Sequence, residues 1–164
     1  MNSRLYNLFI SSQQKLYRFA LSLTKDVTDA EDILQDTLLK LWKARDKWES
    51  WDNFEAYAMR TVRNEYLNYV KVQKSRTYGT LEDIPEFAEP SQTETDMTTD
   101  HLMMRYNWLT SKLPKMQRDI LHLREIEELE YKEIAKVMDI SEAQVKVYLF
   151  RARQYLKEKV HGKR

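Results

Sequence analysis

The chain of 164 residues is 42 % hydrophobic and 12 % aromatic, which is enough for one medium domain or two small domains with packed cores. Two glycines and three prolines are too few for the turns that strands need, so the composition favours helices. The absence of cysteine excludes disulfides and thiolate metal sites and suits a cytoplasmic protein. No apolar run approaches the ~18 residues that a membrane-spanning helix needs, so we expect no membrane insertion.

The charged residues nearly cancel, with 27 basic and 26 acidic side chains, but their distribution is uneven. Residues 1–74 hold 12 basic and 10 acidic side chains, residues 75–100 hold one and seven, and residues 101–164 hold 14 and nine. Since charges are screened over ~8 Å at physiological salt, a ligand senses the local patch and not the sum. The basic C-terminal part can therefore attract a polyanion although the whole chain is nearly neutral.

Apolar residues at spacings of three and four predict three helices in the first half of the chain. The first is expected to cover residues 4–24. Capping patterns at Thr28–Glu31 and at Asp52–Glu55 predict where the second and third helices begin. The third helix is expected to run to about Lys74.

Helical periodicity is lost in residues 75–100, which contain two of the three prolines and the acidic excess, and we expect a flexible, self-repelling linker there. Periodicity returns in four segments, at residues 101–113, 115–127, 131–138 and 142–157. A third capping pattern, formed by Ser141 and Gln144, marks the start of the last segment. The sequence thus predicts an all-α fold of two small helical domains, residues 1–76 and 101–164, joined by a flexible acidic linker at residues 77–100.

The break "MDIS" between the last two predicted helices has the length of the turn in a helix-turn-helix. Asp139 falls in this turn and tolerates the left-handed backbone that such a turn often needs. The second helix of the motif enters the major groove of DNA, so Lys146 and Arg151, which lie off its apolar face, are candidates for contacts to bases or phosphates. A basic amphipathic helix that ends an ordinary bundle is the alternative.

The segment "LPKMQRDILHLREIEELEYKEIAKVMDISEAQVKVYLFRARQYLKEKV" resembles region 4 of bacterial RNA polymerase sigma factors of the extracytoplasmic-function (ECF) group, in the sigma-70 family. The positions that match the family pattern are Leu113, Pro114, Arg118, Glu133, Ile134, Ala135, Val145, Lys146, Arg151, Ala152 and Arg153. The resemblance implies a helix that reads the −35 promoter element with Lys146, Val147, Phe150, Arg151 and Arg153. Departures from the pattern at Asp139, Ala143 and Gln144 concern the −35 sequence that is read and not the mode of docking.

The segment "DAEDILQDTLLKLWKARDKW" resembles region 2.2 of the same family, which binds the clamp helices of the polymerase β′ subunit. An acidic face with one apolar residue, which suits docking onto a basic helix pair, is formed by Asp29, Asp32, Gln35, Asp36 and Leu39. A solvated face on which Asp36 pairs with Lys40 is one alternative, and a magnesium site at Asp32 and Asp36 is another. No glycine-rich cradle or second carboxylate motif accompanies the two aspartates, which disfavours the magnesium site.

The segment "SWDNFEAYAMRTVRNEYLNYVKVQKSR" resembles regions 2.3 and 2.4 of the family, which melt and read the −10 element. An unstacked base needs an aromatic or apolar pocket with an amide group, and Phe54, Tyr57 and Asn64 are the candidates for this pocket. The residues expected to follow the DNA phosphates are Arg60, Arg63, Lys71 and Lys74. Packing in the helix core is the alternative role of Phe54 and Tyr57, and the two roles are compatible.

Together these resemblances imply a transcription initiation factor that binds core RNA polymerase, through the β′ clamp helices and the β subunit, and directs it to promoter DNA. They also imply an anti-sigma factor as a partner, no cofactor and no catalytic residue. The alternative is a stand-alone helix-turn-helix regulator that does not depend on polymerase and whose first half senses a signal or dimerises. Such a regulator has no need of the acidic face at residues 29–39, and an enzyme is a third and less supported class.

Overall fold

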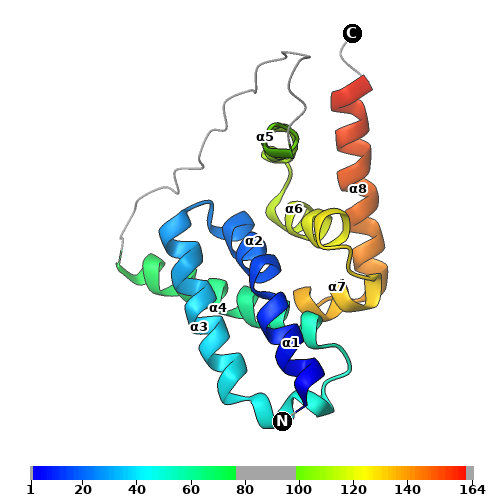
Figure 1. The fold of residues 1–164 in the computed structure, drawn as a ribbon. Helices are drawn as coiled ribbons and strands as arrows, with labels where there is room; N and C mark the ends of the chain where they lie inside the picture. Colours follow the sequence, from blue (N-terminus) through cyan, green and yellow to red (C-terminus); the bar gives the residue numbers. More distant parts are fainter. Residues whose placement is uncertain (1, 77–98, 162–164) are drawn as a thin grey trace.

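The computed structural model of the chain describes residues 2–76 and 99–161 (Figure 1). Within these ranges every regular element is helical, which confirms the predicted all-α class. The elements in the first half are α1 (Ser3–Ser11), α2 (Gln13–Thr24), α3 (Val27–Lys43), the short 3-10 helix η1 (Arg45–Ser50) and α4 (Phe54–Arg76). Those in the second half are α5 (Thr99–Thr110), α6 (Lys115–Leu121), the π-helical turn η2 (His122–Ile126), α7 (Tyr131–Met138) and α8 (Glu142–His161).

The predicted first helix, residues 4–24, is in fact two helices, α1 and α2, which meet at Ser12. The hydroxyl of Ser12 donates a hydrogen bond to the carbonyl of Phe9 at 3.1 Å, while its backbone N–H donates to the carbonyl of Leu8 at 2.9 Å. A serine that bonds back to the preceding turn in this way bends a helix. The bend is invisible in the apolar periodicity, which continues through Ser12 because the chain stays close to helical.

Two of the three predicted capping patterns are wrong by one or two residues. The helix α3 is capped by Asp26, whose side chain accepts a hydrogen bond from the N–H of Asp29 at 2.9 Å, and not by Thr28. The backbone decides this, because Asp26 has the extended conformation of an N-cap and directly follows the left-handed residue Lys25 that ends α2.

At the start of α4 the cap is Asn53 instead of Asp52, and its side chain accepts from the N–H of Ala56 at 3.0 Å. The third capping pattern is confirmed at the start of α8. The N–H of Gln144 donates to the hydroxyl of Ser141 at 3.1 Å, and the N–H of Ser141 donates to the side chain of Gln144 at 2.9 Å. These two reciprocal bonds make a complete capping box.

The helix-turn-helix is formed by α7 and α8, as predicted. Asp139 lies in the turn with a left-handed backbone, at φ 55° and ψ 50°. Ile134 of α7 is fully buried, as are Val145 and Leu149 of α8, and all three belong to the core cluster. The predicted helix at 115–127 is α6 followed by the single π-helical turn η2, so its regular part is shorter than expected.

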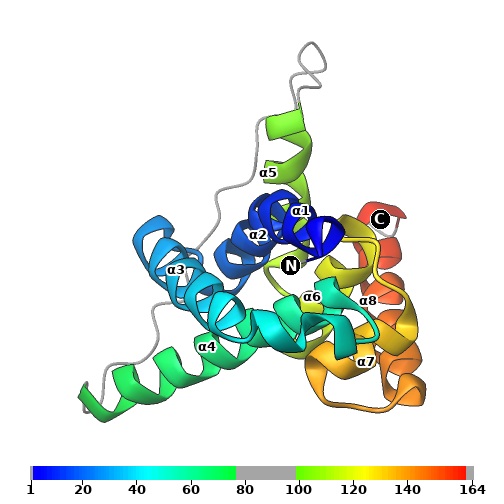
Figure 2. The same ribbon diagram turned by 60° about the horizontal axis from the view of Figure 1, so that its bottom comes forward.

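The predicted linker lies outside the described residues except for Thr99 and Asp100, which already belong to α5. The two halves that it joins are packed into one body. Figures 1 and 2 show α7 beside α4, and α3 and α8 on opposite sides of the molecule. This arrangement leaves the outer faces of α3 and α8 open to solvent.

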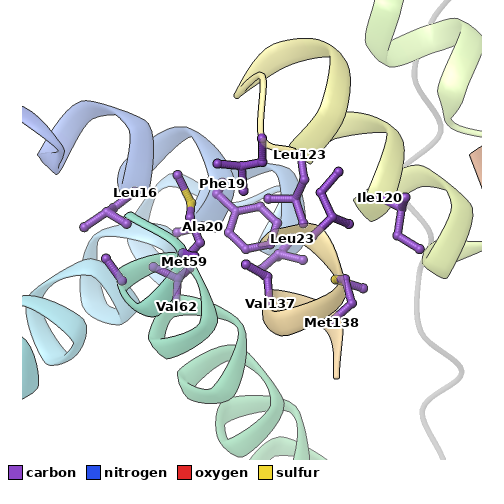
Figure 3. Close-up of a cluster of buried hydrophobic side chains, with 14 of the residues drawn as sticks. Leu16, Phe19, Ala20, Leu23, Met59, Val62, Ile120, Leu123, Val137 and Met138 are labelled. Carbon is purple, nitrogen blue, oxygen red and sulfur yellow. The ribbon is translucent and has the colours of Figure 1, made fainter. Parts of the chain in front are cut away.

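One buried cluster is built from both halves (Figure 3). Phe19 and Leu23 come from α2 and Val62 from α4, and they gather with Leu123 of η2 and Val137 of α7. All five side chains are less than a tenth exposed. Because burial of apolar area is the main favourable term in folding, this cluster holds the second half on the first.

Polar contacts also join the two halves at the edges of the cluster. The side chain of Lys115 lies 4.4 Å from the ring centre of Tyr66, and that of Lys136 lies 3.6 Å from the carboxylate of Asp52. The Lys136–Asp52 pair is largely exposed, so it adds little to stability and mainly fixes orientation.

Candidate functional site

The exposed side of α8 carries the residues expected at DNA. Lys146, Val147 and Arg151 are all exposed, and Phe150 presents 63 % of its surface to solvent. The opposite side of the helix is fully buried through Val145, Leu149 and Ala152, which sets the orientation of α8. The structure therefore brings four of the five predicted −35 residues together on one open surface with both cationic and apolar groups.

Arg153, the fifth predicted residue, is also exposed but has an intramolecular partner. Its guanidinium donates to the carboxylate of Glu125 in η2 at 2.7 and 3.3 Å. The carboxylate of Glu125 neutralises this guanidinium and occupies part of its donor set, which weakens its attraction for a phosphate. Sequence reasoning missed Glu125, because no local pattern relates two residues that are 28 positions apart.

The predicted acidic face lies on the outer side of α3, where Asp32, Gln35 and Asp36 are exposed and Leu39 is 53 % exposed. Lys40, which the alternative interpretation paired with Asp36, instead forms an ion pair with Glu65 of α4. In the described parts of the chain, neither Asp32 nor Asp36 has an ion-pair partner. The face thus combines free carboxylates with one exposed leucine.

Asp29 differs from the rest of this face because it is half-buried and lies beside Tyr69 of α4. Burial raises the pKa of the Tyr69 hydroxyl to about 12, and the hydrogen bond to Asp29 adds to the shift. The side chain of Asp29 therefore also connects α3 to α4.

Of the two aromatic residues predicted for the pocket at the start of α4, Phe54 is buried and Tyr57 is exposed. Phe54 is only 5 % exposed and packs against Trp48 and Trp51, with ring centres 5.3 and 6.0 Å away. Tyr57 is exposed and stacks on Trp51, with ring centres 4.7 Å apart and planes 9° apart. Phe54 thus supports the stacked pair of Trp51 and Tyr57 from the core. Trp51 belongs to this aromatic surface but was not predicted from the sequence. Trp51 precedes the helix, where helical periodicity does not apply.

The polar residues predicted for the −10 element line α4 beyond this aromatic pair. Arg60, Asn64, Lys71 and Lys74 are exposed. Arg63 is half-buried and lies near Lys115 of α6, and the two positive charges repel each other. The structure consequently separates Arg63, at the junction of the two halves, from the four open positions.

Metal-ligand clusters and membrane-spanning helices are both absent from the described residues. Within residues 2–76 and 99–161, no group of three or more His, Asp or Glu side chains is placed to hold a metal ion. In the same ranges, no helix combines the length and the apolar character needed to cross a membrane.

Comparisons with known proteins agree with this arrangement. The sequence profile of sigma-70 region 2 matches residues 8–76, and that of sigma-70 region 4 matches residues 109–156. The chain is 31 % identical over 159 residues to the ECF RNA polymerase sigma factor SigM of Bacillus subtilis, covering 93 % of this chain and 91 % of the relative. It is 26 % identical over 168 residues to the ECF RNA polymerase sigma-E factor of Escherichia coli, covering 97 % of this chain and 88 % of the relative.

Two solved structures share the fold. One is the sigma factor RpoE in complex with the anti-sigma factor NepR from Bartonella quintana, with a TM-score of 0.74, 22 % identity and coverage of 98 % of this chain and 99 % of that chain. The other is CnrH in complex with the cytosolic domain of CnrY, with a TM-score of 0.67, 21 % identity and coverage of 99 % and 92 %. On these sequence matches, this chain belongs to the ECF group of sigma-70 family sigma factors, the transcription initiation factors that direct RNA polymerase to promoters.

Proposed function

We propose that this sigma factor docks on core RNA polymerase with the outer face of α3 and reads promoter DNA with α4 and α8. In terms of the chain, residues 1–76 bind the polymerase and the −10 element, residues 77–100 join the two parts, and residues 101–164 bind the −35 element. The observation that carries the proposal is Phe150, which is 63 % exposed between Lys146 and Arg151 on the second helix of a helix-turn-helix. An aromatic ring held in water between two cations suits a surface that a polyanion covers.

The chemistry of the α8 surface fits the major groove. Lys146 and Arg151 can donate to the acceptors on guanine or to phosphates, and a good bidentate base contact discriminates by ~1–3 kcal/mol. Val147 and Phe150 offer the apolar contact that distinguishes the methyl group of thymine. Arg153 joins as a phosphate contact once it leaves Glu125.

At the −10 element, the stacked pair of Trp51 and Tyr57 is an open platform for an unstacked base. Asn64 lies about two turns beyond Tyr57 in α4, and its side-chain amide supplies donors and an acceptor for a base edge. The phosphate contacts are assigned to Arg60, Arg63, Lys71 and Lys74, of which Arg63 is accessible only if the contact with the second half loosens. Phe54 acts in this site by supporting Trp51.

Docking on the polymerase is assigned to Asp32, Gln35, Asp36 and Leu39, with Asp29 fixing α3 to α4. Carboxylates without intramolecular partners favour a basic surface, and the exposed leucine at the C-terminal end of the face supplies apolar contact. The β′ clamp helices are the partner proposed for this face, and the β subunit is a second polymerase contact.

Docking also explains how a protein with almost no net charge can act at promoter DNA. The basic excess of residues 101–164, 14 basic against nine acidic side chains, neutralises few phosphates, so we expect weak, salt-sensitive binding to free promoter DNA. A polymerase that holds the factor beside the promoter raises the effective concentration of α8 at its element. The stand-alone regulator, in contrast, has to bind its site tightly without polymerase.

An anti-sigma factor is the third partner that we propose. The structures of RpoE and CnrH named above are complexes with NepR and with the cytosolic domain of CnrY, and their fold is shared by this chain. Purification of the full chain from its own cells, followed by mass spectrometry, tests this part. Recovery of polymerase subunits alone, in cells that are not under stress, would contradict it.

Gel filtration of the full chain with core polymerase tests the main proposal. We expect the factor to co-elute with polymerase, and the complex to bind promoter DNA more tightly than the factor alone. The double variant Lys146→Ala and Arg151→Ala is expected to lose promoter binding and keep polymerase binding. The matched control, Lys112→Ala and Lys132→Ala, removes the same charge from exposed positions of the same half and is expected to keep both activities.

Two outcomes would contradict the proposal. If the folded wild-type chain fails to co-elute with polymerase, the stand-alone regulator becomes the better explanation. If the control variant loses promoter binding as strongly as the test variant, net charge and not the α8 surface carries the interaction.

A further inference from the structure

Gln144 is an exposed residue in the first turn of α8 that belongs to no surface described above. It precedes Val147 by three positions and Arg151 by seven, so the three residues share one side of the helix. Val147 and Arg151 belong to the surface proposed for the −35 element. The N-terminal part of the second helix in a helix-turn-helix contacts the base edges, and Gln144 is the member of this side that lies closest to that end.

The side-chain carbonyl of Gln144 is fully engaged inside the protein. Its oxygen Oε1 accepts a hydrogen bond from the N–H of Ser141 at 2.9 Å and a second one from the hydroxyl of the same serine at 3.3 Å. A carbonyl oxygen has two lone pairs, and these two donors use both of them. The carbonyl of Gln144 therefore has no capacity left to accept a hydrogen bond from a base.

The amide nitrogen Nε2 is the part of the Gln144 side chain that stays available. The backbone N–H of Ser141 can only donate, so the amide has to turn its oxygen toward Ser141 and its nitrogen away from it. Within the described residues, Nε2 has no hydrogen-bond partner. The bonds to Ser141 also order the side chain in the free protein, so little rotamer entropy is lost when Nε2 binds another group. Gln144 thus presents a preorganised donor to solvent.

A donor of this kind distinguishes the bases by the groups that they present in the major groove. Guanine presents the acceptors N7 and O6, and thymine presents the acceptor O4. Cytosine presents the N4 amino group, which is a donor, and adenine presents the N6 amino group beside N7. Glutamine commonly reads adenine by donating to N7 and accepting from N6. In this protein the second of these bonds is blocked, because Ser141 already occupies the carbonyl of Gln144.

We propose that Gln144 is a specificity-determining residue of the −35 contact, where it selects a keto base, guanine or thymine, over the amino bases cytosine and adenine. The inference rests on the proposed function, because it requires α8 to lie in the major groove. Lys146 and Arg151 carry charges that also attract phosphates, whereas the amide of Gln144 is neutral. Its replacement is therefore expected to change the sequence preference more than the salt-dependent affinity for DNA.

Two substitutions of Gln144 separate its donor from its role at the start of α8. Gln144→Glu keeps the capping box, because one oxygen of glutamate accepts the bonds from Ser141 in the same way. Its other oxygen replaces the donor Nε2 with an acceptor, which suits the amino groups of cytosine and adenine. Gln144→Met has a similar length and no amide. We expect the glutamate variant to reverse the base preference and the methionine variant to abolish it.

The measurement is the affinity of the complex between the full chain and core polymerase for a series of promoters. The parent promoter is one that the wild-type complex selects from genomic DNA fragments of its own organism, and each −35 position carries each of the four bases in turn. For the wild-type chain we expect one position at which a keto base binds roughly three- to tenfold more tightly than an amino base, as suits one hydrogen bond. At this position Gln144→Glu is expected to favour an amino base, and Gln144→Met to bind all four bases equally.

Gln154→Glu is the matched control, because it adds the same negative charge at an exposed position ten residues further along α8. It is expected to change the affinity for all the promoters by one common factor. The proposal is overturned if Gln144→Glu keeps the base preference of the wild-type chain at every position, or if Gln154→Glu alters the preference in the same way. Failure of the proposed function gives a different result, since the double variant Lys146→Ala and Arg151→Ala would then bind the parent promoter as tightly as the wild-type chain.

Discussion

Arg18 donates two hydrogen bonds to the same oxygen of Glu127, at 2.7 and 3.0 Å, although 109 positions separate the two residues in the sequence. The carboxylate of Glu127 is completely buried, whereas the guanidinium of Arg18 is nearly half exposed. Burial raises the pKa of Glu127, and the hydrogen bonds from Arg18 oppose this rise. The pair is thus a polar connection between the two halves, with one partner fully buried.

Replacing this arginine is expected to destabilise the protein strongly. Arg18→Gln leaves a buried carboxylate without its cation, and we expect the free energy of unfolding to fall by about 2 kcal/mol, somewhat less than for a fully buried pair. Urea denaturation of the full chain measures the change. The control is Lys15→Gln, which breaks the more exposed pair of Lys15 and Glu55 at 3.4 Å and is expected to cost less than about 1 kcal/mol. Equal losses in the two variants would contradict this role of Glu127.

His122 is expected to make the protein sensitive to acid. It is buried and stacks on Phe19 with ring centres 5.9 Å apart, and burial lowers its pKa from 6.5 to about 4. Between these two values the unfolded chain binds more protons than the folded protein, so stability falls as the pH drops through this window. The full contribution, present above pH 6.5, is about 3 kcal/mol.

Urea denaturation between pH 7 and pH 4 measures this dependence. His122→Gln is expected to flatten the curve over the window, whereas His161→Gln, at an exposed position at the end of α8, is expected to leave it unchanged. An unchanged slope in the His122 variant would assign the acid sensitivity to other groups, such as the buried carboxyls.

Neutralising Glu125 is expected to strengthen binding to DNA. The carboxylate of Glu125 holds Arg153 at 2.7 Å, and Glu125→Gln frees this guanidinium for a phosphate. We expect tighter promoter binding by the complex with polymerase, and a slope of affinity against salt that is steeper by about one phosphate contact. Fluorescence anisotropy at several salt concentrations measures both. Glu158→Gln, which removes the same charge from an exposed position near the end of α8, serves as the control. An identical gain in both variants would point to net charge alone.

Truncating Leu39 is expected to impair polymerase binding without affecting folding. Leu39→Ala removes the exposed apolar side chain of the α3 face, and we expect at least a roughly tenfold weaker affinity for core polymerase, as for an interface hot spot. Val27 is equally exposed, at 54 % against 53 % for Leu39, but it lies at the first turn of α3 outside the proposed face. Val27→Ala is therefore the matched control in the same binding assay. A loss in the control as large as in the test variant would place the contact elsewhere on α3.

Features decided by neighbouring residues could be predicted from the sequence. The helix-turn-helix followed from apolar spacing, the left-handed Asp139 from its place in the turn, and the start of α8 from the capping box of Ser141 and Gln144. In each case the interacting groups lie within one helical turn. The same local signals failed where two adjacent residues could both cap a helix, as with Asp52 and Asn53, because the choice depends on how the preceding chain enters the helix.

The sequence also predicted which faces are buried and which are charged, but not what they meet. An apolar stripe shows that a helix face is covered, and many other stripes can cover it equally well. Only the tertiary structure pairs Arg18 with Glu127, holds Arg153 at Glu125 and stacks Tyr57 on Trp51. A cavity of about 280 Å³ between the halves belongs to the same class. It exists because the helical surfaces of the two halves do not fit together completely. Each surface is determined by its own stretch of sequence, and no single stretch contains both.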